Sequence, residues 1–414
     1  MRSLTINKQL LYLFASNLAI LFVGMGLFPV LPLYATDLGA TSGVVGVYLA
    51  LTYASITFGT MLTGWLAKRI PYRALLAGAG LLGIPALVLM GHVTAMWQLI
   101  ALTGIVWFTG GIGLSLVSVL TGVITDPERR GKSFGLMSLS LPLAALAGGM
   151  TVGQLIAWQG YATMFAALGA LWVVLPLSAW RLAPVSLKPA RKDPARTTMT
   201  QPGLGGAFYA FTLVTLLSTA AINVGRMGTS LSMHALAFSP SEVASTATVS
   251  GLVAIPVVIW IGSLSDRLDR RRLLVLSYVL IAAGVSTLIV ATQLWHFWLS
   301  ATLLLVARCA NGSVGAALVT DMLAPANLLR GLSLLNTSGW AAGVLTYATS
   351  GFLVSSLGTS PVYVGAGLLA ALSALYVEGV RGRYRQRAQA VSEDLKRITQ
   401  TTRPVSTAGG RIAR

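Results

Sequence analysis

About twelve apolar stretches, most of them some 20 residues or longer and joined by short loops, determine what this chain can fold into. A helix of about 20 apolar residues can span the hydrocarbon core of a bilayer. A hydrophobic content of 55%, a charged content of 10% and a mean hydropathy of +0.77 agree with this interpretation. We therefore predict an all-α integral membrane protein. The predicted spans are 11–35, 43–66, 74–92, 96–121, 133–157, 161–180, 205–233, 243–264, 273–292, 296–320, 332–356 and 361–380.

The basic residues are distributed unevenly along the chain. The net charge of +18 is also typical of nucleic-acid-binding proteins, but all except two of the 29 Lys and Arg lie before the first span, in alternate loops or in the tail. This is the positive-inside pattern, which predicts a multi-pass protein of the cell's inner (plasma) membrane with both termini cytoplasmic. It argues against a nucleic-acid partner. We expect the basic tail either to rest on anionic lipid or to be solvated.

The sequence contains an internal repeat with an offset of about 200 residues. Residues 64–73, Gly-Trp-Leu-Ala-Lys-Arg-Ile-Pro-Tyr-Arg, align with residues 262–271, Gly-Ser-Leu-Ser-Asp-Arg-Leu-Asp-Arg-Arg. An even number of spans in each repeat gives both repeats the same orientation in the membrane. We predict a six-helix half at 1–181, a Pro-rich cytoplasmic linker at 182–204, a second six-helix half at 205–380 and a tail at 381–414.

The second copy of this segment resembles the loop motif of the major facilitator superfamily, Gly-x-Leu-Ala/Ser-Asp-Arg-x-x-Arg-Arg. The first copy departs from it, because Lys68 replaces the Asp. Span 296–320 contains Arg308-Cys-Ala-Asn311-Gly312, which is similar to the family's Arg-x-x-polar-Gly motif. The resemblance covers residues 8–380 and implies a two-lobed transporter that works by alternating access.

The resemblance also implies a conformational gate at the cytoplasmic ends of the helices. The acidic residue of the loop motif, Asp266, would face the positive N-terminal end of the span that begins near Ser133. Lys68 would weaken the equivalent contact in the other half. The alternative is that these loops only supply topogenic positive charge. The residues expected to form the gate are Gly262, Asp266, Arg267, Arg270, Arg271, Arg130, Gly64 and Arg69.

Candidate substrate contacts come from the spans that line the central cavity in this family, namely the first and fourth of each half. Arg226 and Arg308 are the only basic residues inside spans, and a charge there costs at least about 2.5 kcal/mol on insertion scales. A planar guanidinium can bind a carboxylate or phosphate through two hydrogen bonds. The alternative is that each Arg bonds backbone carbonyls or extends to the membrane surface. The further candidates are Asn223, Asn311, Trp107 and Asn17.

The sequence does not indicate the coupling ion, because none of the eleven acidic residues lies in the middle of a predicted span. Asp37 is the best candidate for a proton site, with a helix-end residue as the alternative. The single cysteine and the three separated histidines predict no metal site and no cofactor. The fifth span has Gly149-Met-Thr-Val-Gly153-Gln154 where proton-driven drug exporters of this family often have Gly-Pro-x-x-Gly-Gly.

The sequence predicts a secondary transporter that moves a small organic solute, and the two arginines favour an anionic one. The motif content predicts that the protein is not an enzyme. The main alternative is proton-coupled efflux of amphipathic compounds. A non-transporting receptor or a membrane enzyme is a remote alternative, because the sequence contains no Gly-x-Ser-x-Gly, His-Glu-x-x-His or phosphate-loop motif. The expected partners are the substrate and the lipid bilayer, and we expect a monomer.

Overall fold

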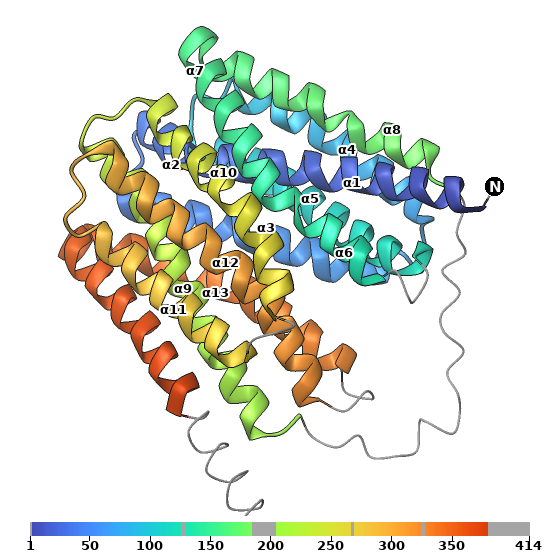
Figure 1. The fold of residues 1–414 in the computed structure, drawn as a ribbon. Helices are drawn as coiled ribbons and strands as arrows, with labels where there is room; N and C mark the ends of the chain where they lie inside the picture. Colours follow the sequence, from blue (N-terminus) through green and yellow to red (C-terminus); the bar gives the residue numbers. More distant parts are fainter. Residues whose placement is uncertain (1, 126–129, 184–203, 266–268, 324–327, 380–414) are drawn as a thin grey trace, which may run out of the picture.

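The computed structural model describes residues 2–125, 130–183, 204–265, 269–323 and 328–379 (Figure 1). Every regular element in these ranges is a helix, and the ranges contain no strand. The predicted fold class, an all-α bundle of twelve helices in two six-helix halves, is confirmed. The linker and the tail fall almost entirely outside the described residues.

The N-terminal half is built from eight helical segments. They are α1 (Arg2–Leu27), α2 (Leu31–Asp37), α3 (Ser42–Leu66), α4 (Tyr72–Met90), α5 (Met96–Ile124), α6 (Arg130–Ser138), α7 (Ser140–Trp172) and α8 (Val174–Arg181). The first predicted span is interrupted between α1 and α2, next to Pro29 and Pro32. Proline lacks the N–H that would continue the helical hydrogen bonds.

The C-terminal half follows the linker and contains six helices. They are α9 (Gly206–Ala235), α10 (Pro240–Ser265), α11 (Arg270–Thr287), α12 (Leu294–Met322), α13 (Leu328–Leu357) and a last helix at Thr359–Gly379. Figure 1 shows the halves as two bundles, blue to green and green to red, that lie side by side.

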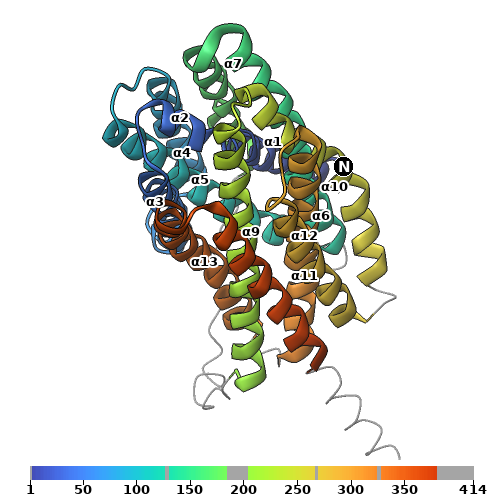
Figure 2. The ribbon, with the colours of Figure 1, turned by 90° about the vertical axis from the view of Figure 1, so that its left-hand side faces the viewer.

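Nine segments of the described residues are long and apolar enough to cross a membrane. One of them, Ser133–Arg181, has 49 residues, and a continuous helix of that length would extend roughly 70 Å, about twice the core of a bilayer. Gly160 interrupts it with φ of 76° and ψ of −174°, and the chain reverses there at the end of the bundle seen in Figures 1 and 2. This segment therefore supplies two crossings. With α11 and α13, which also run along the bundle, the described chain crosses twelve times.

Two helix pairs hold the halves together, α7 against α10 and α3 against α13. The two helices of each pair lie close together because glycines of one helix face a glycine or the backbone of the other. A Cβ added to Gly351 of α13 would lie 2.7 Å from the Cα of Gly46 of α3, and one added to Gly149 of α7 would lie 2.6 Å from the backbone N of Thr248 of α10. Small residues allow helix backbones to approach in this way in membranes.

The close contacts between the halves concentrate at one end of the molecule. Gly46 lies near the start of α3 and Gly351 near the end of α13, at the end of the bundle where α2 lies. Toward the opposite end, where α8 ends and α9 begins, the two bundles diverge in Figure 1. There, a Cβ added to Gly64 of α3 or to Gly339 of α13 would meet no atom within 4 Å. The structure is therefore closed at the α2 end.

Candidate substrate site between the two halves

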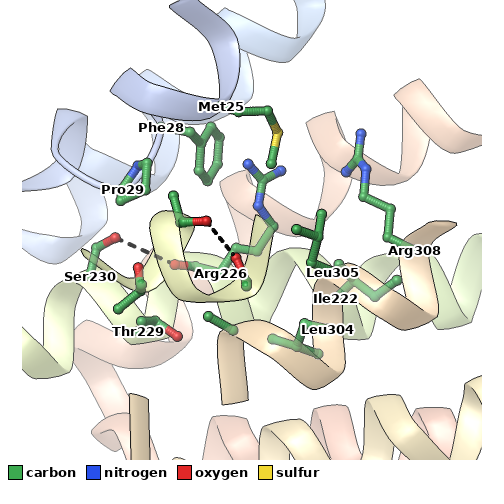
Figure 3. A pocket seen from close by; sticks show the side chains of 14 residues that line it. Met25, Phe28, Pro29, Ile222, Arg226, Thr229, Ser230, Leu304, Leu305 and Arg308 are labelled. Carbon is green, nitrogen blue, oxygen red and sulfur yellow. Dashed lines mark hydrogen bonds between the residues drawn. The ribbon is translucent and has the colours of Figure 1, made fainter. Parts of the chain in front are cut away.

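Arg226 of α9 crosses from the C-terminal half to the N-terminal half. Its Nη1 donates a hydrogen bond to the hydroxyl of Tyr53 on α3 at 3.0 Å. Its guanidinium carbon lies 3.7 Å from the centre of the Phe28 ring, at the break between α1 and α2. A cation over an aromatic face is attracted by the negative charge density of the ring. Arg226 therefore links the halves by two contacts, and Figure 3 shows its side chain pointing at Phe28.

Four aromatic rings from both halves surround this contact. Tyr53 packs against Tyr347 of α13 with ring centres 4.9 Å apart and against Trp340 at 5.9 Å. Phe28 lies 5.8 Å from Tyr347 and 6.2 Å from Tyr53. Phe28 and Tyr53 meet edge to face with an interplanar angle of 79°, an arrangement that aromatic pairs prefer, and the other pairs are tilted. The rings form a continuous cluster across the interface between α3 and α13.

Arg308 of α12 occupies the other side of the same region. In Figure 3 its guanidinium and that of Arg226 extend to the same side of their helices, toward the α1 residue Met25. Arg308 lies near Tyr53 and Tyr347. Among the described residues, the partners of both guanidinium groups are aromatic rings and hydroxyls, and none is a carboxylate.

Two adjoining pockets share Met25, Phe28, Arg226 and Arg308 and differ in the remainder of their walls. The first, which we name the hydroxyl pocket, lies against the C-terminal half and also contains Pro29, Ile222, Thr229, Ser230, Thr246, Ala247, Ser250, Ala301, Leu304 and Leu305. The second, the apolar pocket, lies mainly against the N-terminal half. Its other lining residues are Ile20, Leu21, Val23, Gly24, Tyr53, Ile56, Val106, Trp107, Gly110, Leu114, Leu141, Trp172 and Trp340.

The helices expected to line the cavity all contribute to these pockets, as α1, α5, α9 and α12. Of the six predicted substrate contacts, the structure brings Arg226, Arg308 and Trp107 together at the pockets. The contributions of α3, α7, α10 and α13 were not anticipated. Tyr53, Tyr347 and Trp340 were not predicted, because they lie on α3 and α13, outside the four helices from which the candidates came. These rings with polar tips lie well inside the predicted spans and not at the span ends, and this position in the sequence could have identified them.

The three predicted asparagines lie elsewhere and connect helices. Asn223 is fully buried on α9, and its Oδ1 accepts a hydrogen bond from Tyr347 at 3.2 Å. Asn311 of α12 accepts from Ser277 of α11 at 2.5 Å, and Asn17 of α1 donates to the carbonyl of Met137 at 3.3 Å. None of the three lines either pocket within the described part of the chain.

Asp37, the predicted proton site, is exposed at the end of α2, at the closed end of the molecule. Its Oδ2 accepts a hydrogen bond from the hydroxyl of Tyr161 at 3.2 Å. Asp37 does not line the two pockets. A proton that binds to it would therefore lie at the closed end of the molecule and not beside the arginines.

The predicted gate is described only in part. Asp266 and Arg267 lie outside the described residues, and the structure does not describe the side chain of Arg130 or the surroundings of Gly262. Arg69 stacks on Trp65 with its guanidinium carbon 4.0 Å from the ring centre. Arg270 donates to the carbonyl of Ala317 at 3.1 Å, and the backbone N–H of Arg271 donates to Asp269 at 3.0 Å. The latch between Asp266 and the start of the fifth span therefore stays a prediction.

A family profile described as Major Facilitator Superfamily matches residues 13–233 and 204–408. An MFS-type transporter of Aspergillus fumigatus is 28% identical over 148 residues, which are 34% of this chain and 32% of that protein. The uncharacterized MFS-type transporter YtbD of Bacillus subtilis is 25% identical over 213 residues, 47% of this chain and 52% of that protein. The matched segments thus span about a third and about half of these relatives' lengths.

Solved structures with the same fold cover nearly the whole chain. A POT family transporter in complex with a thioalcohol-conjugated peptide has a TM-score of 0.74 at 12% identity, covering 91% of this chain and 96% of that one. The nucleoside transporter NupG has a TM-score of 0.71 at 15% identity, covering 90% and 99%. At this level of identity the likeness concerns the fold alone.

Proposed function

Because the chain belongs to the major facilitator superfamily, we propose that it is a secondary transporter that carries a small organic anion by alternating access. The observation that supports the anion is the pair Arg226 and Arg308, which line both pockets between the halves. Among the described residues these guanidinium groups contact no carboxylate. An anionic substrate would supply the missing negative charge.

Two cations in the middle of a membrane protein are energetically costly. Each would cost at least about 2.5 kcal/mol at the centre of a single helix, and a cation there is normally offset by water, a partner or a ligand. Hydroxyls and ring faces offset part of this cost through Tyr53 and Phe28. A carboxylate or phosphate would form the stronger, charge-assisted hydrogen bonds.

Alternating access is supported by the position of the contacts between the halves, which concentrate at one end of the molecule. The halves are closed at the α2 end and diverge at the other, and the two pockets lie between them. With the positive-inside pattern, the diverging end would face the cytoplasm. A substrate that draws Arg226 away from Tyr53 and Phe28 would remove contacts that hold the halves in this arrangement, which would couple binding to movement.

The test is uptake of radiolabelled organic carboxylates and phosphates into proteoliposomes. Arg308→Gln is expected to lower uptake of a transported anion by at least about tenfold, equivalent to about 1.4 kcal/mol in binding. Arg181→Gln is the matched control, because Arg181 is exposed at the end of α8 and away from the pockets. Anion uptake that is the same in the wild type and in Arg308→Gln would contradict the proposal.

The second candidate function, proton-coupled efflux of amphipathic compounds, is favoured by the three tryptophans of the apolar pocket. In that case Asp37 is the proton site we propose, and Asp37→Asn should abolish transport driven by a pH gradient while exchange without a gradient continues. Tyr161→Phe, which removes only the hydrogen bond to Asp37, is the companion variant. Efflux that is insensitive to a pH gradient would exclude this candidate.

A further inference from the structure

We infer that the substrate is an amphipathic anion with a ring-bearing apolar body in the apolar pocket and a hydrogen-bond donor in the hydroxyl pocket. Its negative group would lie between Arg226 and Arg308, where the two pockets meet. This inference rests on the proposed function and specifies the substrate of the same site. It also joins the two alternatives left by the sequence, a small anion and an amphipathic compound.

The walls of the apolar pocket indicate the body of the substrate. Apart from the two arginines, the described residues that line it are aliphatic side chains, glycines and rings. Trp172 forms a fixed part of the wall, because it is almost fully buried and its indole N–H donates to the carbonyl of Ala79 at 3.5 Å. Trp107 and Trp340 come from opposite halves and line the same space. A flat aromatic group could stack on either of them as the halves move.

The hydroxyl pocket indicates a different chemistry at the other end of the substrate. Each of its hydroxyls already donates its proton to a backbone carbonyl of the preceding helical turn. Thr229 donates to Gly225 at 2.8 Å, Thr246 to Val243 at 2.7 Å and Ser250 to Ala247 at 3.0 Å; Ser230 donates to the carbonyl of Arg226 at 3.5 Å, as the dashed line in Figure 3 shows.

A hydroxyl has one proton to donate and two lone pairs that can accept. Since the protons of Thr229, Thr246 and Ser250 are used within the helices at 2.7–3.0 Å, their oxygens offer acceptor positions to a ligand while these bonds are kept. An O–H or N–H group on the substrate would fill those positions, whereas a second anionic group would be repelled by them. The hydroxyl pocket is therefore suited to a donor and not to a second carboxylate.

The orientation of the substrate follows from the order of these features. The donor end lies against α9 and α10, the negative group at the arginines of α9 and α12, and the ring against α1 and α5. A hydroxy- or amino-substituted aromatic carboxylate has this arrangement. Acetate has only the negative group, and a simple aromatic carboxylate has two of the three features.

The experiment compares the affinities of the purified protein for acetate, benzoate, 2-naphthoate and 6-hydroxy-2-naphthoate. Each affinity is measured by how strongly the compound inhibits uptake of a radiolabelled organic carboxylate into proteoliposomes. The apparent affinity is expected to rise along this series, by about tenfold from benzoate to 2-naphthoate and about threefold more with the hydroxyl. Trp107→Ala should reduce the preference for naphthoate over benzoate at least fivefold, and Trp107→Phe should restore most of it.

Trp97→Ala is the matched control on the same helix, because Trp97 is 69% exposed whereas Trp107 is 8% exposed. It should keep the naphthoate preference of the wild type. Thr246→Val combined with Ser250→Ala should remove the gain from the 6-hydroxyl and leave the preference for naphthoate over benzoate. Thermal unfolding of each variant in detergent checks that it is folded.

The results separate this inference from the function on which it rests. Equal affinity for all four anions, with uptake that still depends on Arg308, would overturn the inference and leave the proposed function standing. Equal competition by naphthoate and by its neutral amide would overturn both. A preference for naphthoate that Trp107→Ala and Trp97→Ala leave unchanged would also overturn the inference.

Discussion

Arg226 and Tyr53 belong to different halves of the molecule and are joined by a hydrogen bond of 3.0 Å. The bond forms only when α9 and α3 lie close together, which is the case because the halves are closed at the α2 end. The same Arg226 stacks on Phe28 and lines both pockets. One side chain thus contacts the space available to a substrate and the interface that must open for transport.

Tyr53→Phe removes the hydroxyl that accepts from Arg226 and keeps the ring that packs against Tyr347 and Trp340. It leaves a guanidinium N–H without this partner, so we expect a loss of about 1–3 kcal/mol in stability of the closed arrangement. The measurement is the unfolding temperature of the purified protein. Tyr209→Phe is the control, since Tyr209 is half exposed near the start of α9. Equal unfolding temperatures in wild type and Tyr53→Phe would contradict the prediction.

Gly351→Ala should weaken closure at the α2 end. The added methyl group would lie 2.7 Å from the Cα of Gly46 across the interface, and neither backbone can yield without separating the helices. The measurement is the distance between spin labels on cysteines introduced at the exposed positions Val44 and Leu357, in a background without Cys309. We expect a population with a longer distance.

The control for that experiment is Gly365→Ala, because an added Cβ at Gly365 meets no atom within 4 Å. A distance distribution that is the same for Gly351→Ala and for Gly365→Ala would show that the glycine pair does not limit closure.

Gly160→Ala should destabilise the turn between the fifth and sixth crossings. Gly160 combines φ of 76° with ψ of −174°, a backbone conformation that is essentially restricted to glycine, and a residue with a Cβ there costs roughly 1–3 kcal/mol. We expect a lower unfolding temperature for the purified protein. Gly135→Ala in α6 is the matched control, with a helical backbone and open space around the added Cβ. A larger effect from Gly135→Ala than from Gly160→Ala would refute this account.

Lys68→Asp tests the predicted asymmetry of the gate. Lys68 occupies the place of the acidic residue in the first copy of the loop motif, so an Asp there should interact favourably with the positive N-terminal end of α13. We expect a shift toward an arrangement that is closed where α8 ends and α9 begins, seen as more crosslinking between cysteines placed at the end of α3 and at the start of α13. Lys68→Ala should shift it less. No change with either variant would support the purely topogenic interpretation of these loops.

The crossings, the repeat and the two arginines inside spans could be predicted from the sequence, because a bilayer acts on each residue according to its own polarity. An apolar stretch of sufficient length crosses the membrane whatever its neighbours are, and a charge inside it is conspicuous. Even the interruption of the first span, near Pro29, has a local cause that can be identified in the sequence.

The partners of those residues were decided by the tertiary structure alone. Whether Asn311 faces a cavity or Ser277 depends on how α12 is rotated against α11. Tyr53 of α3 reaches Arg226 of α9, 173 residues further along the chain, because glycines let α3 approach α13, which also packs against α9. The sequence does not state how these helices are rotated about their axes. Helix rotation and the relation between the halves arise from packing over the whole molecule, and they set the site's chemistry.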